Sequence, residues 1–149
     1  MIEISNIEFF REVERLILDG ERVTLRVKGY SMRPWLRDGR GVVILRRHRD
    51  EELQKGAIVL FRIFDQYILH RIVERRGDLL TLAGDGNYRQ VERCYCKNVV
   101  AIAESIVKRN GEIMPCASRA WQLRSKAWLM LPALLRRLIL SILWHIGWK

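Results

Sequence analysis

Cysteine is scarce in this sequence, and its three copies fit neither a disulfide framework nor a metal site. Cys94 and Cys96 would point to one side of a strand, but no histidine or second cysteine pair lies near enough to complete a zinc site. An odd cysteine count without a secretion signal favours reduced thiols. We therefore expect no metal, no cofactor and a cytoplasmic protein.

The sequence also has no secretory signal and no long uncharged apolar run. Acidic residues interrupt its N-terminal segment, at Glu3, Glu8, Glu12 and Glu14. Arg136 and Arg137 divide the very apolar C-terminal segment, so no uncharged run reaches the roughly 18–20 residues that a membrane span requires. Neither end of the chain therefore predicts a signal peptide or a transmembrane helix.

Acidic residues are absent from Ser118 to the last residue, whereas six basic residues lie there. The whole chain carries a net charge of +10, so much of its basic excess belongs to this apolar tail and the rest is only mildly basic. Acidic partners are thus expected, either nucleic acid or anionic lipid. We disfavour nucleic acid because the charge excess is concentrated in an apolar segment.

The hydrophobic pattern predicts a mostly β domain over residues 1–117. An amphipathic helix is expected at about 5–19, followed by a core of short strands over about 22–115, since apolar and polar residues alternate in many short runs. The tail, 118–149, is expected to be helical and divided by Pro132. Its apolar face, tryptophans and basic charge are typical of a helix on an anionic membrane surface. A helix packed on the domain or on a second subunit is the alternative.

Histidine is as scarce as cysteine, which leaves few candidates for a general base. Ser31 occupies a tight turn after a strand, and a serine hydroxyl needs a base to become a nucleophile. His70 alternates with Ile68 and Ile72 on one face of a strand, where a neutral imidazole is favoured. Asp85, in a glycine-flanked loop, is the candidate carboxylate that orients His70. Whether Asp85 or another carboxylate has this role is left open by the sequence.

Each of these residues also has a purely structural interpretation. Ser31 could be an ordinary turn serine, His70 a core histidine and Asp85 a turn former within Gly-Asp-Gly-Asn. Spacing does not decide between the two interpretations, because a catalytic triad is defined by geometry and not by order along the chain.

Four segments, however, resemble the conserved boxes of signal peptidase I and its LexA-like relatives, in the same order. Gly29-Tyr30-Ser31-Met32-Arg33-Pro34-Trp35-Leu36, followed by Asp38-Gly39, is similar to the G-x-S-M-x-P-x-L-x-x-G box. The other three boxes correspond to Lys55–Arg62, Ile68–Val73 and Leu82–Asn87. The resemblance covers roughly residues 27 to 105 and implies a LexA/signal-peptidase-like β catalytic domain.

The resemblance also implies roles for individual residues. Ser31 would be the nucleophile, His70 the general base and Asp85 the residue that orients the base. Bacterial signal peptidases and LexA-type proteins have lysine where this chain has His70, so the chain resembles the Ser-His-Asp branch of endoplasmic-reticulum and archaeal signal peptidases. The Ser31 backbone N–H would help to form the oxyanion hole. Met32 and Pro34 would shape the turn and the substrate cleft.

The implied function is a serine endopeptidase that cleaves a leader or precursor peptide by acyl transfer. Gly39-Arg40 and Gly56-Ala57 depart from the Gly-Asp that the family often has at these places. Family members carry a transmembrane segment or a DNA-binding domain before the serine box, so this chain resembles a stand-alone core, placed in the cytoplasm or on the inner face of the membrane. The alternative is a catalytically silent protein of the same fold that binds a membrane or a partner.

Overall fold

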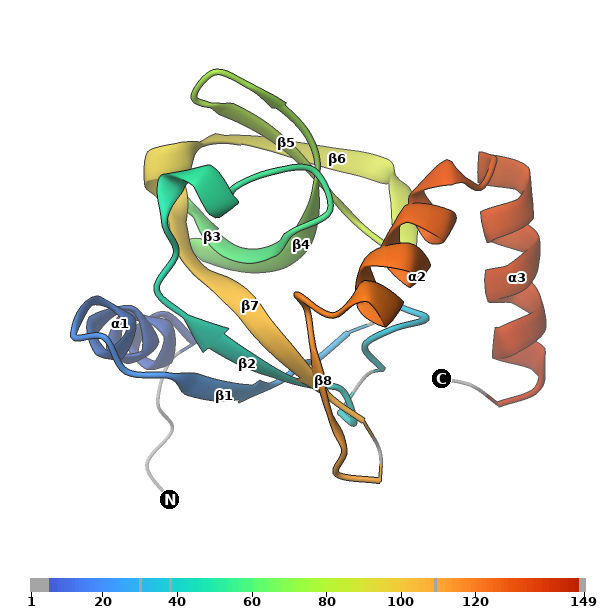
Figure 1. Ribbon diagram of the computed structural model, residues 1–149, viewed down its shortest axis with the longest axis horizontal. Helices are drawn as coiled ribbons and strands as arrows, with labels where there is room; N and C mark the ends of the chain where they lie inside the picture. The colour runs from blue at the N-terminus through green and yellow to red at the C-terminus, as the bar shows by residue number, and fades with distance from the viewer. Residues whose placement is uncertain (1–5, 30, 38, 109, 148–149) are drawn as a thin grey trace.

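The computed structural model describes residues 6–29, 31–37, 39–108 and 110–147, apart from the side chains of Tyr88 and Arg89. Eight strands of this part of the chain form one antiparallel sheet, with a helix before it and two helices after it (Figure 1). The elements follow one another in the order α1 (Asn6–Leu18), β1 (Val23–Arg26), β2 (Val42–Arg46), η1 (Asp50–Glu52), β3 (Ile58–Ile63), β4 (Gln66–Arg76), β5 (Leu79–Gly84), β6 (Asn87–Tyr95), η2 (Cys96–Asn98), β7 (Val99–Val107), β8 (Ile113–Pro115), α2 (Arg119–Met130) and α3 (Ala133–His145).

The predicted fold class is confirmed, and two strands were missed. The sheet has the order β1-β2-β7-β3-β4-β5-β6, with β8 paired to β7. The sequence patterns predict strands at 23–28, 41–45, 57–62, 67–74, 79–82 and 98–108, which correspond to β1 to β5 and β7. They do not predict the short β8, or β6, which is a polar strand at the end of this order. The predicted helix at 5–19 is α1, and Ser5, Tyr30 and Asp38 lie outside the described residues.

Two hydrophobic clusters fill the two sides of the curved sheet. One is built around Leu60, Ala101 and the inner residues of α1, such as Val13 and Ile17. The other lies between β3, β4, β5 and the Cys94 region of β6, and contains Phe61 and Ile72. Since successive side chains of a strand point to opposite faces, neighbouring residues of β3 and β4 belong to different clusters. This division decides where each candidate catalytic side chain points.

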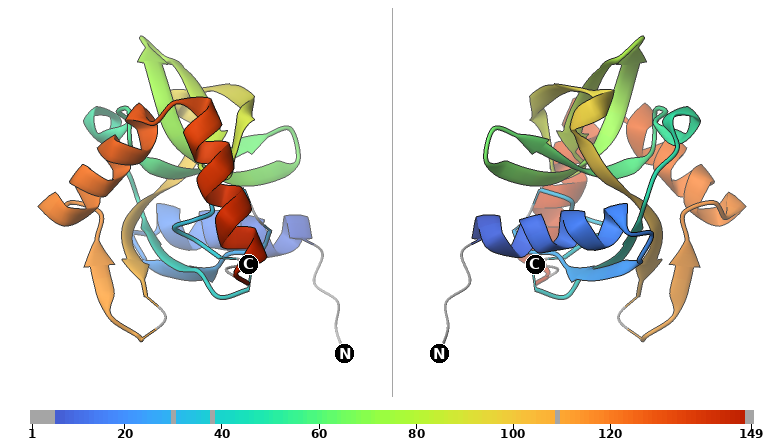
Figure 2. Two further views of the ribbon diagram at one scale, coloured as in Figure 1. Left: turned by 90° about the vertical axis from the view of Figure 1, so that its right-hand side faces the viewer. Right: turned by 90° about the vertical axis from the view of Figure 1, so that its left-hand side faces the viewer.

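The C-terminal segment is two helices that meet at a sharp bend. The Ser118 side chain caps α2 by accepting a hydrogen bond from the Trp121 backbone N–H at 3.3 Å. Pro132 divides α2 from α3 as predicted, and their axes differ by 113°. Both helices lie at one end of the sheet, opposite α1 (Figures 1 and 2). Their inner sides are buried, through Trp121, Ser125 and Trp128 of α2 and Leu140 of α3.

Candidate active site

The turn that carries Ser31 connects β1 to β2 and is anchored in the core. Gly29 begins it with a φ of 89°, a conformation that favours glycine. The Leu36 N–H then donates to the Met32 carbonyl at 2.9 Å, and both of these side chains are fully buried. Trp35 packs edge-on against Trp121 and Trp128 of α2, with ring centroids 5.8 and 6.1 Å apart. The turn is therefore fixed between the core and a C-terminal helix.

The Ser31 backbone lies directly against the end of β5. The Gly86 N–H donates to the Ser31 carbonyl at 2.7 Å. A Cβ atom at Gly84 would lie 2.3 Å from the Ser31 carbonyl oxygen and 3.0 Å from the Ser31 Cβ, so only glycine allows this approach. The structure thus brings together two of the segments that sequence reasoning selected, the serine turn and the Gly-Asp-Gly-Asn turn.

His70 lies in β4 and has a carboxylate partner on β6. Its side chain is buried, 6% exposed, with its ring centroid 6.2 Å from that of Phe61. Nδ1 is 2.8 Å from the Glu92 Oε2 atom, and the Glu92 side chain is itself mostly buried. A carboxylate on Nδ1 holds a neutral imidazole with its proton on that nitrogen, which leaves Nε2 as the atom that can accept a proton. This is the arrangement that a general base requires.

The Asp85 carboxylate, expected beside His70, is bound by Arg71 in this structure. Arg71 Nε donates to the Asp85 Oδ1 at 2.8 Å and Arg71 Nη2 donates to its Oδ2 at 2.7 Å, with both side chains almost fully buried. Arg71 follows His70 directly in β4, so their side chains point to opposite faces of the sheet. The carboxylate that contacts His70 in this structure is therefore Glu92 and not Asp85.

The Arg71–Asp85 pair is a buried structural cluster that ties α2 to the site. Arg71 Nη1 also donates to the Gly56 carbonyl at 2.9 Å and to the Ser125 hydroxyl at 2.8 Å. The Trp128 indole N–H donates to the Asp85 carbonyl at 3.2 Å. Removing one partner of a buried, hydrogen-bonded ion pair strongly destabilises the fold, because the other partner is left as an unpaired buried charge. This cluster therefore fixes the turn on which Ser31 rests.

Ser31 and His70 lie at the same end of the β4–β5 pair. Ala83 of β5 pairs with Arg71, next to His70, and the following residue, Gly84, is the one that Ser31 touches. Within the described residues the Ser31 hydroxyl makes no hydrogen bond to His70 or to another side chain.

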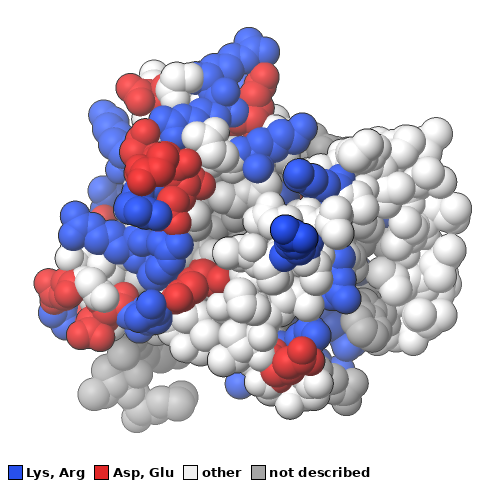
Figure 3. Space-filling model, viewed as in Figure 1, with Lys and Arg blue, Asp and Glu red and all other residues white. Residues whose placement is uncertain are grey.

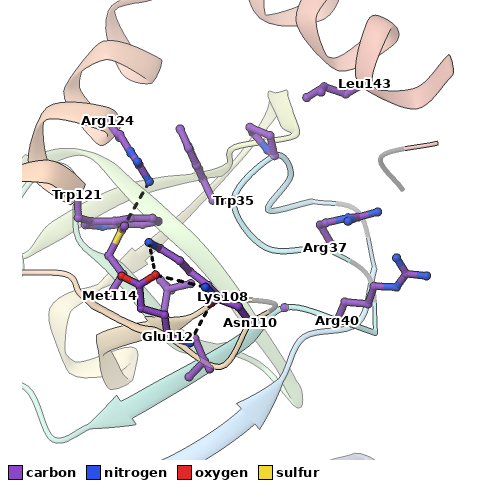
Figure 4. Close-up of a pocket in the computed structure, with 14 residues that line it drawn as sticks. Trp35, Arg37, Arg40, Lys108, Asn110, Glu112, Met114, Trp121, Arg124 and Leu143 are labelled. Atoms are coloured by element: carbon purple, nitrogen blue, oxygen red, sulfur yellow. Dashed lines mark hydrogen bonds and ion pairs between the residues drawn. The ribbon is translucent and has the colours of Figure 1, made fainter. Parts of the chain in front are cut away.

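Two cavities adjoin the serine turn. One, of about 370 Å³, lies between Arg33 of the turn, Gly86 and Asn87 after β5, and Arg137 and Trp144 of α3. The other, of about 570 Å³, is lined by Pro34 and Trp35 and extends toward β8 and α2, with Trp121 and several cations in its wall (Figure 4). Of the two residues expected to shape the cleft, Pro34 lines this second cavity, whereas Met32 is buried in the core beneath the turn. Neither lining contains Ser31 or His70.

Neither a metal site nor a cysteine nucleophile is supported in the part of the chain that the structure describes. No three His, Cys, Asp or Glu side chains gather there as metal ligands. The cysteines are free, and burial raises the pKa of the Cys94 thiol, on the same side of the sheet as His70, to about 11. A thiol of that pKa is protonated at neutral pH and is a poor nucleophile.

Sequence reasoning missed Glu92 because it did not predict β6. A period-2 signal was present, since Cys94 and Cys96 are both buried on one side and Glu92 precedes them by two residues. Extending that alternation toward the N-terminus would have placed Glu92 on the same face as the cysteines. The surrounding arginines and glutamine obscured the pattern.

Comparison with known proteins gives a family for this fold and site. No curated protein and no solved structure matches the chain. A family model described as Peptidase S24-like matches residues 2–105, which include Ser31, His70, Asp85 and Glu92 and end within β7. The match covers more than half of the chain and agrees with its sheet and N-terminal helix. The chain therefore belongs to the Peptidase S24-like family, within the LexA/signal peptidase I-like superfamily.

Proposed function

We propose that this protein is a serine endopeptidase in which Ser31 is the nucleophile, His70 the general base and Glu92 the carboxylate that orients the base. The observation that carries the proposal is the 2.8 Å contact between the His70 Nδ1 and Glu92, at the end of the β4–β5 pair where the Ser31 turn rests. Membership of a peptidase family supports it.

The proposed reaction is acyl transfer. His70 Nε2 takes the proton of the Ser31 hydroxyl as its oxygen attacks the peptide carbonyl, and Glu92 stabilises the imidazolium that forms. The tetrahedral intermediate collapses to an acyl-enzyme when the imidazolium gives its proton to the leaving amine. A water molecule deprotonated by His70 then hydrolyses the ester. The Ser31 backbone N–H is the candidate donor to the oxyanion.

The proposed substrate is a leader or precursor peptide bound in extended form. β1 is an edge strand of the sheet order and runs directly into the serine turn. A peptide that pairs with an edge strand is held in register by main-chain hydrogen bonds. Such pairing along β1 would lead the scissile bond toward Ser31.

Cleavage of a proteome-derived peptide library tests this proposal. New peptide termini, identified by mass spectrometry, are expected with the full-length protein and absent with Ser31→Ala and His70→Ala. Ser141→Ala, an exposed serine of α3, is the matched control and is expected to cleave like the parent. No cleavage by the folded parent protein, or equal cleavage by Ser31→Ala, would contradict the proposal and favour a catalytically silent protein of this fold.

A further inference from the structure

We propose that the outer side of α3, with the basic residues of α2 and α3 around it, is a docking face for an anionic lipid bilayer. This inference goes beyond the proposed peptidase function and does not depend on it. It rests on which side chains the folded chain leaves exposed, and on their charge.

The outer side of α3 is a continuous apolar stripe. Leu134, Leu138, Ile142 and Ile146 follow one another at intervals of four residues and are 77%, 55%, 52% and 70% exposed. Residues four apart lie above one another on a helix, so the four side chains form a single ridge. Leu140 points the other way and is buried. The fold thus uses one side of α3 for packing and leaves an equally apolar side exposed.

The charged side chains of α2 and α3 are all of one sign. Several of these cations are exposed, and from Ser118 onward the sequence has no acidic residue. In Figure 3 the end of the molecule formed by α2 and α3 is largely white, with Lys and Arg at its margin, whereas both signs intermix over the sheet. The exposed cations in question are Arg119, Arg124, Lys126 and Arg137.

An anionic bilayer fits both properties of the face. Aliphatic side chains enter the boundary between headgroups and acyl chains, and lysine and arginine at the margin attract anionic lipids. Trp144, 41% exposed, lies with its ring 5.2 Å from the Arg33 guanidinium. Tryptophan is enriched at this depth of a bilayer because its ring is apolar and its N–H is polar.

A second copy of the chain fits the face less well. In a two-fold dimer the same patch would meet itself, so the cations of one α3 would approach those of the other. No acidic residue of the segment could compensate that repulsion, and like charges brought together at an interface disfavour association.

The helices would lie on the bilayer and not cross it. No single helix among the described residues is long and apolar enough to span a membrane, and only the bent pair of α2 and α3 passes by length and composition. The hydrogen bonds from Arg71 to Ser125 and from Trp128 to Asp85 hold α2 on the sheet. With α2 held there, the 113° bend persists, so only the apolar stripe of α3 enters the lipid while the cations of α2 act from the surface.

Vesicle co-sedimentation of the full-length protein tests the proposal. We expect it to sediment with vesicles of phosphatidylcholine and phosphatidylglycerol, and much less with phosphatidylcholine alone. The double variant L138S/I142S should weaken binding by more than about tenfold, since two aliphatic side chains no longer enter the bilayer. Arg119→Gln and Lys126→Gln should each weaken binding to the anionic vesicles by about fivefold.

Phe64→Ser is the matched apolar control, because Phe64 is 93% exposed in the turn between β3 and β4, outside α2 and α3. It should bind vesicles like the parent, and thermal unfolding should show that every variant is folded. Equal loss of binding by Phe64→Ser and L138S/I142S would overturn the proposal. So would a dimer in sedimentation velocity, without vesicles, that L138S/I142S abolishes, because the face would then belong to a second copy.

Discussion

His70 and Arg71 are adjacent residues of β4 that contact different carboxylates on opposite faces of the sheet. His70 is bonded to Glu92 of β6, and Arg71 to Asp85 of the turn after β5. The first contact is suited to moving a proton, whereas the second is a fully buried ion pair that holds the backbone in place. Exchanging the two carboxylates for amides should therefore have different consequences.

Glu92→Gln should reduce the rate of peptide cleavage and leave the fold intact. The amide cannot stabilise the His70 imidazolium, and loss of such a carboxylate lowers turnover by about 10²–10⁴-fold. Asp85→Asn should instead reduce the free energy of unfolding by about 3–5 kcal/mol, because Arg71 keeps a buried charge without its counter-ion. Cleavage kinetics and chemical unfolding of both variants check this. Full activity in folded Glu92→Gln would contradict the proposed role of Glu92.

The positions of Ser31 and His70 could be predicted from local pattern, whereas the partner of His70 could not. Alternation of Ile68, His70 and Ile72 correctly placed the imidazole on a buried face. Asp85 seemed a suitable partner for His70 because glycines flank it. Alternation in β4, however, puts Arg71 on the face opposite to His70, and Arg71 is the residue that binds Asp85. The strand pairing also shifts between Ala83 and Gly84, just before this turn. The contact of Asp85 therefore depends on how the strands pair in the folded structure, which the local sequence pattern does not show.

At the scale of elements, helices and strands were predicted from their amphipathic patterns, and β6, which has no such pattern, was missed. α1 and most strands have one apolar face, which their sequences display. β6 lies at one end of the sheet order and carries mainly polar residues, so its pairing with β5 and not its composition makes it a strand. Because Glu92 belongs to β6, missing the element also meant missing the residue.

The loop after β2 provides a pH-dependent contact between elements. Glu52 of η1 accepts hydrogen bonds from the Arg46 side chain of β2 and from the Arg49 backbone N–H. The Arg46 guanidinium, opposed by partial burial and aided by the Arg49 N–H, lowers the pKa of the Glu52 carboxyl to about 2. The ordinary value is 4.5, so the stabilisation is present above pH 4.5 and is lost as the pH falls toward about 2.

Glu52→Gln should therefore flatten the dependence of the free energy of unfolding on pH between 4.5 and about 2. Denaturant unfolding at a series of pH values in this window measures it. Glu51→Gln, an exposed neighbour in the same short helix, should change the slope less. Identical slopes for Glu52→Gln and the parent would show that the Arg46 contact does not form in solution.

For the whole molecule, the family region and the folded unit have different boundaries. The Peptidase S24-like match ends at residue 105, within β7. The expected tail at 118–149 nevertheless starts with a helix whose Trp121 and Trp128 are buried against the core. The tryptophan spacing indicated an apolar helix, but sequence alone could not tell that one half packs on the sheet and the other presents an exposed stripe.

A chain ending at Ala117 should be less stable than the full chain by more than about 3–5 kcal/mol, the usual cost of removing one buried tryptophan. It also loses the Ser125 acceptor of Arg71 and the Trp128 donor to Asp85. A chain ending at Pro132, which lacks only α3, should lose much less. Denaturant unfolding of the three chains makes the comparison, and equal stability of the chain ending at Ala117 and the full chain would refute this account of α2.

The hydrogen bond from Trp128 to the Asp85 carbonyl also couples the motions of α2 to those of the serine turn. The next residue, Gly86, donates its N–H to the Ser31 carbonyl, so one short turn is bonded to the serine on one side and to α2 on the other. A fluctuation that lifts α2 from the sheet breaks the Trp128 and Ser125 bonds and removes one support of that turn. Hydrogen exchange of the Gly86 amide should then occur at the rate at which α2 opens. The opening rate of this helix would therefore set the lifetime of the Ser31 turn conformation.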